Sequence, residues 1–279
     1  MIPFDFEYYK PTTVTEALNI FEDIQKRGKK VIFYSGGTEF ITFARMNKMA
    51  AEAVIDIKGI PDCQVLEVQG ETLVIGSAVS LNKIVDSKLF PLLGQTVKGV
   101  ADHTSRNKIT LGGNINSGLM YREGVLPLLL SDAMVKIAGN EEKNILPLKD
   151  VFNKKLQLNS GQLLVQIIID VSYASQKFIC LKKTKISKVG YPVVTIAALI
   201  KDSKIRAAFS GVCDYPFRSS EIEAILNDTS LTNDEQIEKA VKGLPSPIVN
   251  DIQASAGYRE FVLKNTLQET IEALKEKTS

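Results

Sequence analysis

The chain has 279 residues, of which 44% are hydrophobic and 24% charged, a balance typical of a globular protein with one large domain or two modest ones. Its net charge of +2 and the lack of a long basic run argue against nucleic-acid and membrane-surface partners. The N-terminus shows no leader pattern, and no apolar run reaches the roughly eighteen residues of a membrane span, so we expect a cytoplasmic protein.

The chain is poor in residues that bind metals or act as nucleophiles. Cys63, Cys180 and Cys213 are widely spaced, so we expect reduced and mostly buried thiols, too few for the four thiolates of an iron-sulfur cluster. The single histidine, His103, argues against multi-histidine metal sites, and we expect it at a helix end or on the surface. Any redox chemistry is therefore expected to come from a bound cofactor.

The first sixty residues predict a small βαβ-like unit that ends near Lys58. Thr13 and Glu16 have the spacing of a capping box, which indicates where the first helix begins. The expected elements are a helix over 13–28, a strand over 31–34, a helix over 40–49 and a strand over 54–57.

A pair of glycines follows the first of these strands, in the sequence SGGTEF. Gly36 and Gly37 can adopt positive φ and have no Cβ, so that backbone N–H groups can converge on a phosphate without a charged side chain. No lysine follows them, so the nucleotide-binding pattern GxxxxGK[ST] is absent. Taken alone, this loop is better interpreted as a structural turn.

A second glycine loop changes that interpretation. Before it, residues 65–77 predict a β-hairpin, residues 80–89 a helix, and residues 97–102 further helix. The segment SRNKITLGGN over 105–114 then places a threonine beside another glycine pair. Two such loops would close on a diphosphate from opposite sides, each supplying N–H donors and a hydroxyl group.

The following apolar runs predict core elements. We expect a buried helix over 126–133, a strand over 134–138 that turns at Gly139 and Asn140, and a fully apolar strand over 163–169. The polar segment 170–176 is a plausible domain boundary.

The remainder predicts a second, α+β domain. A strand over 178–183 and a hairpin over 193–212 indicate a three-stranded antiparallel sheet. Helical patterns follow over 220–227, 234–242 and 252–275.

The order of these motifs resembles the FAD-binding medium subunit of the molybdenum hydroxylases, the xanthine dehydrogenase and carbon monoxide dehydrogenase family. The resemblance is carried by FDFEYYKPTTVTEAL, YSGGTEF, AVIDIKGI, LVIGSAVSLNKI, SRNKITLGGNI, GQLLVQIII and LKKTKISKVGYPVVTIAA. It implies an α+β fold with a two-part FAD-binding domain of the vanillyl-alcohol oxidase (PCMH) type over 1–170, divided into 1–58 and 59–170. A C-terminal domain of the carbon monoxide dehydrogenase flavoprotein type would occupy 175–279.

The resemblance also implies the cofactor site, because both glycine loops wrap the FAD diphosphate in that family. The loop residues that it assigns are Tyr34, Ser35, Gly36, Gly37, Thr38, Glu39, Phe40, Thr110, Gly112, Gly113, Asn114 and Ser117. Leu164 and Lys182 stand where relatives pack the adenine and approach the cofactor. It assigns no catalytic residue and no metal ligand to this chain.

Two positions depart from the family pattern. Glu123 replaces an aspartate that contacts the sugar-phosphate side of the flavin, and Gly190 with Tyr191 stand where many relatives carry an aspartate. A solvated surface position is the alternative for Glu123, and a solvated charge run is the alternative for Lys182. The second departure leaves the electron acceptor open.

The function implied is electron transfer within a three-subunit hydroxylase. A molybdopterin-binding large subunit would oxidise the substrate, a [2Fe-2S] small subunit would pass electrons to FAD here, and NAD+, dioxygen or a quinone would receive them. Two alternatives remain: a self-contained flavin reductase of the same broad fold, for which we find no proton donor, and a flavin-free scaffold subunit. The substrate of such a complex is left open by this sequence.

Overall fold

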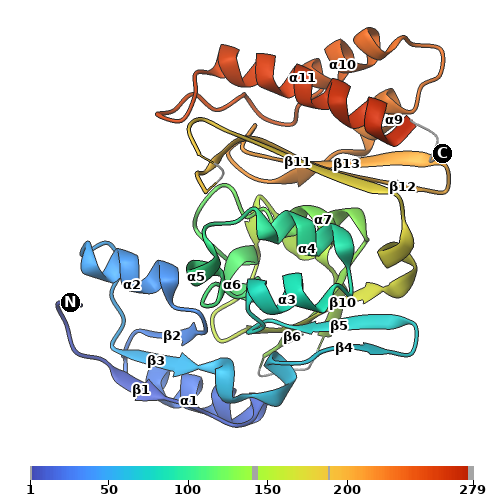
Figure 1. Ribbon diagram of the computed structural model, residues 1–279. Helices are drawn as coiled ribbons and strands as arrows, with labels where there is room; N and C mark the ends of the chain where they lie inside the picture. The colour runs from blue at the N-terminus through green and yellow to red at the C-terminus, as the bar shows by residue number, and fades with distance from the viewer. Residues whose placement is uncertain (1, 140–143, 188, 276–279) are drawn as a thin grey trace.

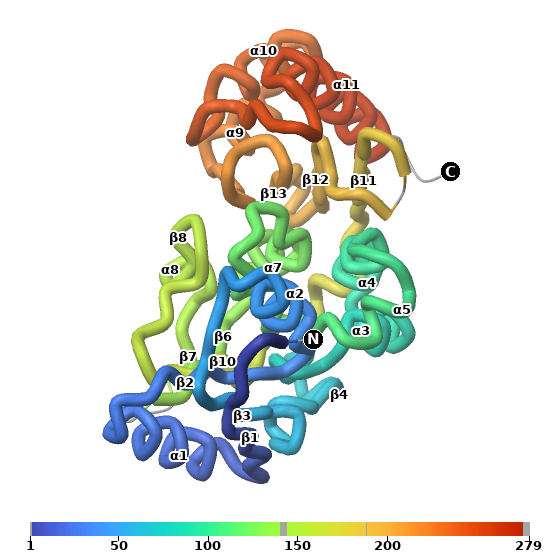
Figure 2. Tube along the Cα trace, turned by 90° about the vertical axis from the view of Figure 1, so that its left-hand side faces the viewer, coloured from blue at the N-terminus to red at the C-terminus, as the bar shows by residue number. Residues whose placement is uncertain are grey.

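Four β-sheets organise the part of the chain that the computed structural model describes, residues 2–139, 144–187 and 189–275. Three sheets carry an N-terminal, a middle and a C-terminal part, and the fourth is a hairpin of β8 (Phe152–Asn153) and β9 (Lys155–Leu156). Figures 1 and 2 show the same vertical order from two sides, with α1 (Val14–Lys26) at the bottom and α10 (Asn233–Lys242) at the top.

The N-terminal part is a parallel three-stranded sheet, so the predicted βαβ arrangement is confirmed. Its strands lie in the order β1 (Glu7–Tyr9), β3 (Ala53–Asp56) and β2 (Val31–Tyr34), and β2 leads into α2 (Thr38–Arg45). The sequence did not predict β1, which is only three residues long and partly exposed.

The start of α1 follows the predicted cap in part. The Thr13 hydroxyl accepts a hydrogen bond from the Glu16 N–H at 3.1 Å, as an N-cap does. The Glu16 carboxylate, however, accepts from the Thr12 N–H at 2.7 Å and not from Thr13, so the capping box is incomplete.

The middle part is an antiparallel five-stranded sheet in the order β4-β5-β10-β6-β7. Its strands are β4 (Leu66–Gln69), β5 (Thr72–Gly76), β6 (Met134–Ala138), β7 (Asn144–Pro147) and β10 (Leu163–Asp170). The predicted hairpin is confirmed as β4 and β5, and β10 is apolar because it is the central, mostly buried strand. The turn expected at Asn140 lies outside the described residues.

Short helices cover this sheet and connect it to its neighbours. They are η1 (Ile57–Gly59), η2 (Pro61–Cys63), α3 (Leu81–Ser87), α4 (Pro91–Lys98), α5 (His103–Arg106), α6 (Leu111–Ile115), α7 (Val125–Leu130), α8 (Leu148–Val151) and η3 (Val171–Ser175). The expected helix over 97–102 is wrong. Its first two residues are the end of α4, which begins at Pro91. Ala101, beyond this helix, has a φ of 50°, which is incompatible with an α-helix.

The C-terminal part has four antiparallel strands, where the sequence predicted three. They are β11 (Phe178–Thr184), β12 (Pro192–Lys201), β13 (Lys204–Ser210) and β14 (Phe217–Arg218). The two-residue β14 is too short to produce an alternating pattern, which is why it was missed. The helices α9 (Ser220–Leu226), α10 and α11 (Ala256–Lys275) cover the outer face of this sheet (Figure 1).

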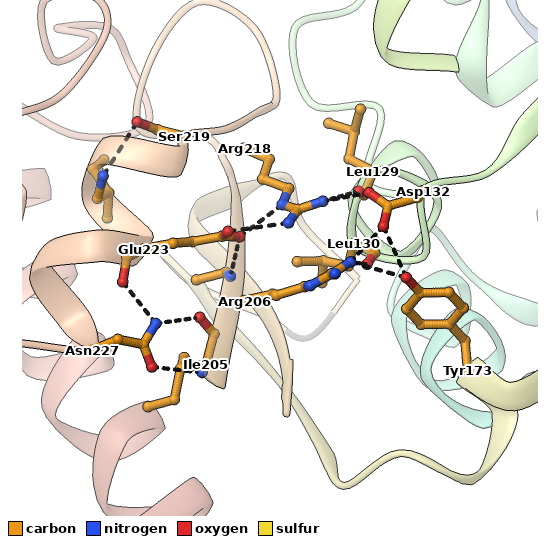
Figure 3. A network of polar contacts seen from close by, with 12 residues as sticks. Leu129, Leu130, Asp132, Tyr173, Ile205, Arg206, Arg218, Ser219, Glu223 and Asn227 are labelled. Carbon is orange, nitrogen blue, oxygen red and sulfur yellow. Dashed lines mark hydrogen bonds and ion pairs between the residues drawn. The ribbon is translucent and has the colours of Figure 1, made fainter. Parts of the chain in front are cut away.

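The opposite face of the C-terminal sheet packs on the middle part. Ala197, Leu199 and Ala208 of this sheet belong to the same buried cluster as the residues of α4 and α7. A polar network at one edge adds to this contact (Figure 3). There the Asp132 carboxylate accepts hydrogen bonds from Arg206 at 2.6 Å, from Arg218 at 2.8 Å and from the Tyr173 hydroxyl at 2.8 Å.

Candidate functional site

A cavity of about 690 Å³ lies where the three parts meet, a size typical of cofactor sites. All fifteen residues assigned to the cofactor from the sequence line it: Tyr34, Ser35, Gly36, Gly37, Thr38, Glu39, Phe40, Thr110, Gly112, Gly113, Asn114, Ser117, Glu123, Leu164 and Lys182. The fold therefore brings both loops and the three separate residues to one cavity.

The first loop offers backbone donors to this cavity. Among the described residues, none accepts a hydrogen bond from the amide N–H groups of residues 36–40, which lead into and begin α2. Gly37 has a φ of 72°, a conformation that a side chain would disfavour. A Cβ on Gly36 would overlap the carbonyl oxygen of Lys108 in the second loop. The loop thus combines free N–H donors with a very close approach to its partner loop.

The second loop was expected to supply N–H donors as well, but the N–H groups of its two glycines are used within the protein. Gly112 donates to the carbonyl oxygen of Ser77 at 2.8 Å, and Gly113 donates to the hydroxyl of Thr110 at 3.2 Å, which caps α6. The Asn114 side chain accepts from the Gly124 N–H at 2.9 Å. In this structure the second loop contributes a wall and a hydroxyl group to the cavity, and the first loop contributes the free N–H donors.

Direct bonds join the two loops. The hydroxyl oxygens of Ser35 and Thr110 lie 2.8 Å apart. The Glu39 carboxylate accepts hydrogen bonds from the Ser117 hydroxyl and from the Gly118 N–H, the latter at 2.9 Å. These bonds fix the separation of the loops, so this end of the cavity is preformed.

A polar cluster around the buried Asp56, behind the first loop, was missed by the sequence reasoning. Lys58 Nζ donates to the Ser35 carbonyl oxygen at 2.7 Å and to the Asp56 carboxylate at 2.8 Å, and the Tyr8 hydroxyl donates to Asp56 at 2.6 Å. The hydrogen bond to Asp56 raises the pKa of Tyr8 to about 12. Because a trans peptide points its N–H opposite to its carbonyl, Lys58 directs the Gly36 N–H away from itself. Asp56 could have been found from the sequence, because it lies near the end of a predicted parallel strand and ligand sites lie at the carboxyl ends of such strands.

Glu123 and Lys182 form a buried ion pair at the wall where the middle and C-terminal parts meet. Lys182 Nζ lies 3.1 Å from Glu123 and 2.7 Å from the Gly99 carbonyl oxygen, and the Thr195 hydroxyl donates to Glu123 at 3.0 Å. Burial raises the pKa of Glu123, although Lys182 and Thr195 oppose the shift. Since Glu123 is only 4% exposed, the surface alternatives for both residues are wrong.

Aromatic and apolar groups form the other walls. The rings of Tyr121 and Tyr191 stack with centroids 4.6 Å apart, and Leu164 contributes a buried aliphatic wall. Tyr191, which marks a departure from the family pattern, is thus part of the cavity lining. The exposed His103 begins α5 and does not line the cavity.

The donor set fits FAD. The free N–H row of residues 36–40 suits a diphosphate, and the apolar walls suit the two ring systems. In the described ranges no group of three or more metal-ligating side chains was found, and no helix there is long and apolar enough to cross a membrane.

Comparisons with known proteins agree with this geometry. A family model described as the FAD binding domain in molybdopterin dehydrogenase matches residues 4–170. The carbon monoxide dehydrogenase medium chain of Hydrogenophaga pseudoflava is 32% identical over 122 residues, which cover 42% of each chain. The glyceraldehyde dehydrogenase medium chain of Sulfolobus acidocaldarius is 24% identical over 95% of this chain and 96% of its own.

The fold is also similar to solved structures. A chain of the carbon monoxide dehydrogenase from Hydrogenophaga pseudoflava, in a form that lacks the Mo-pyranopterin moiety of the molybdenum cofactor, superposes with a TM-score of 0.86. The match covers 98% of both chains at 23% sequence identity, so it supports the fold.

Proposed function

Because this chain belongs to the family of FAD-binding domains in molybdopterin dehydrogenases, we propose that it is the FAD-carrying electron-transfer subunit of a molybdenum hydroxylase complex. The observation that carries the proposal is the single cavity that both glycine loops line. The names of its relatives, which are medium chains of dehydrogenases, agree with this assignment.

We assign the parts of the cavity as follows. The N–H groups of residues 36–40 hold the diphosphate, and Thr110 and Gly113 close on it from the second loop. Leu164 packs on the adenine side. The Glu123 and Lys182 pair forms the wall at the C-terminal part, where it positions the flavin side of the cofactor through its fixed charges.

The bound FAD would supply the redox chemistry, accepting single electrons and delivering them in pairs. The side chains of this chain bind and orient it, and the stacked Tyr121 and Tyr191 limit the access of water and of an acceptor to the cavity. No acid or base of this chain is required for oxidation of the organic substrate.

The proposed partners follow from this role. A molybdopterin-binding large subunit would oxidise the substrate, and a [2Fe-2S] small subunit would deliver the electrons. NAD+ or another acceptor would take them from the flavin. The substrate is then determined by the large subunit.

The test is an FAD titration of the purified chain, followed by its visible spectrum, for the wild type beside Gly113→Val. A Cβ at Gly113 would lie 2.9 Å from the Thr110 hydroxyl oxygen, and the larger side chain would reduce the space in the cavity. We expect stoichiometric yellow wild-type protein and much weaker binding by the variant. Gly257→Val is the control, because no atom lies within 4 Å of a Cβ there.

Three results would contradict the proposal. Equal FAD binding by both proteins would refute the placement of the site. A colourless wild type would favour a scaffold role. Turnover of NADPH with a sugar nucleotide by the chain alone would favour a self-contained reductase.

A further inference from the structure

Arg122 is a buried cation on the cavity wall that has no ion-pair partner. Arg122 is 6% exposed, and it lines the same cavity as the two loops. Among the described residues, no carboxylate lies within ion-pair distance of it. Its Nε is buried without a hydrogen-bond partner.

The contacts that the structure gives Arg122 do not neutralise its charge. Its Nη2 donates to the Lys154 carbonyl oxygen at 2.5 Å, and the guanidinium lies 5.4 Å from the centre of the Phe152 ring. Burial lowers the pKa of Arg122, and the more distant charges of Glu39 and Asp214 oppose that shift. Since an arginine stays protonated in proteins, a charge remains buried here without an anion against it.

The other charged groups of the cavity do not supply that anion. Glu123 is paired with Lys182, and the Glu39 carboxylate is engaged by Ser117 and Gly118. Arg122 is therefore the cation of the described cavity lining that is left without an ion-pair partner. An anionic ligand in the cavity would relieve the cost of its burial.

We propose that Arg122 is a phosphate-binding residue of this cavity and that it holds the diphosphate of FAD against the first loop. This inference rests on the proposed FAD binding. Arg122 lines the same cavity as residues 36–40, whose N–H groups are free. Those N–H groups and the guanidinium are complementary donors for one dianionic group, since a guanidinium binds phosphate through several N–H groups at once.

The proposal predicts opposite effects on the empty and the loaded protein. Arg122→Met keeps most of the side-chain volume and removes an unpaired buried charge, so the melting temperature without FAD should stay equal or rise. FAD binding should weaken by about tenfold to a hundredfold, the range for losing a hydrogen bond to a charged group. Arg122→Lys, which keeps the charge but not the fork of donors, should show a smaller loss.

The experiment compares thermal unfolding and flavin titrations of the wild-type chain, Arg122→Met and Arg122→Lys, with FAD and with riboflavin as probes. Lys88→Met is the matched control, because Lys88 is an exposed cation outside the cavity lining and, like Arg122 (29°), has a positive φ (57°). We expect the loss with FAD only, since riboflavin carries no phosphate, and no effect of Lys88→Met on either probe.

Several outcomes would overturn the assignment. Wild-type FAD affinity in Arg122→Met would show that no anion binds the guanidinium. An equal loss with riboflavin would show that its partner is not a phosphate. A lowered melting temperature without FAD would indicate that Arg122 only supports the fold. If the wild type itself bound no FAD, the proposed function would fail first, and this inference with it.

Discussion

The hydroxyl oxygens of Ser35 and Thr110 lie 2.8 Å apart, although 75 positions separate them in the sequence. The same Thr110 hydroxyl accepts the N–H of Gly113 and so caps α6. One side chain therefore both begins the second-loop helix and ties this loop to the first. The protein fixes the position of both loops before a ligand arrives, which lowers the ordering cost of binding.

Thr110→Val tests this double role, because valine has the shape of threonine without the hydroxyl. We expect a loss of about 1 to 2 kcal/mol in stability from the missing cap, together with weaker FAD binding. Thr110→Ser, the matched control, should keep both. In a double-mutant cycle with Ser35→Ala, urea unfolding should show a coupling of about 0.5 to 1.5 kcal/mol. Strictly additive effects would mean that the bond between the loops contributes nothing.

Gly36→Ala should separate the two loops. A Cβ there would overlap the carbonyl oxygen of Lys108, which is backbone and cannot rotate away as a side chain can. We expect lower thermal stability and at least about a tenfold loss of FAD affinity, which is a little over 1 kcal/mol. Gly257→Ala, with open space around its Cβ, should be neutral or slightly stabilising. Unchanged FAD affinity in Gly36→Ala would refute the close approach of the loops as a requirement for binding.

Lys182→Met should make stability depend strongly on pH through Glu123. The buried carboxylate loses its cation, which costs about 3 kcal/mol or more near neutral pH. Burial already raises the pKa of Glu123, and without Lys182 the pKa rises further. A raised folded-state pKa gives stability that is present below the ordinary glutamate pKa and is lost as pH rises through the folded value. The variant should therefore be closest to the wild type in mild acid.

Urea unfolding of the FAD-free protein at several pH values measures this effect. Adding Glu123→Gln to Lys182→Met should remove most of the extra pH dependence, since the amide cannot ionise. Two results would show that Lys182 does not act through the charge of Glu123. One is a loss of stability in Lys182→Met that is the same at every pH, and the other is a pH dependence that persists unchanged after Glu123→Gln is added.

The residues of the candidate site were predictable because they lie in local motifs. Gly36, Gly37, Gly112 and Gly113 stand beside threonines at turns, and the family resemblance linked the two loops. Their conformational and steric requirements are local, so the sequence records them. The β4 and β5 hairpin was predictable for the same reason, since Gly70 with φ of 59° marks the turn.

What the sequence did not predict depends on long-range contacts. Lys58 donates to the Ser35 carbonyl oxygen, and the Arg122 guanidinium lies beside the Phe152 ring. In the sequence, neither residue can be told from an ordinary exposed lysine or arginine. The short strands β1 and β14 have two or three residues and no usable period. The use of second-loop N–H groups within the protein also depends on Ser77, a residue of another segment.

The Asp132 network between the middle and C-terminal parts leads to the last prediction (Figure 3). Burial alone would raise the pKa of Asp132, but the hydrogen bonds from Arg206 and Tyr173 and the charges of Arg206 and Arg218 hold it below its usual value. A lowered folded-state pKa gives stability that is present above the ordinary aspartate pKa and is lost as pH falls through the folded value. Asp132→Asn should therefore lower the stability at neutral pH and leave it almost unchanged in strong acid.

The expected cost at neutral pH is about 1 to 2 kcal/mol, a modest figure because the Asp132 side chain is half exposed and solvent screens the pairs. Asp202→Asn is the matched control, since Asp202 is an exposed aspartate that also has positive φ (52° against 49° for Asp132). Urea unfolding at pH 7 and below about pH 3.5 measures both variants. Because Arg206 and Arg218 belong to the C-terminal sheet, loss of the carboxylate should also loosen its contact with the middle part, seen as faster amide hydrogen exchange in β13. A stability deficit in Asp132→Asn that does not shrink in acid would exclude the charge as its cause.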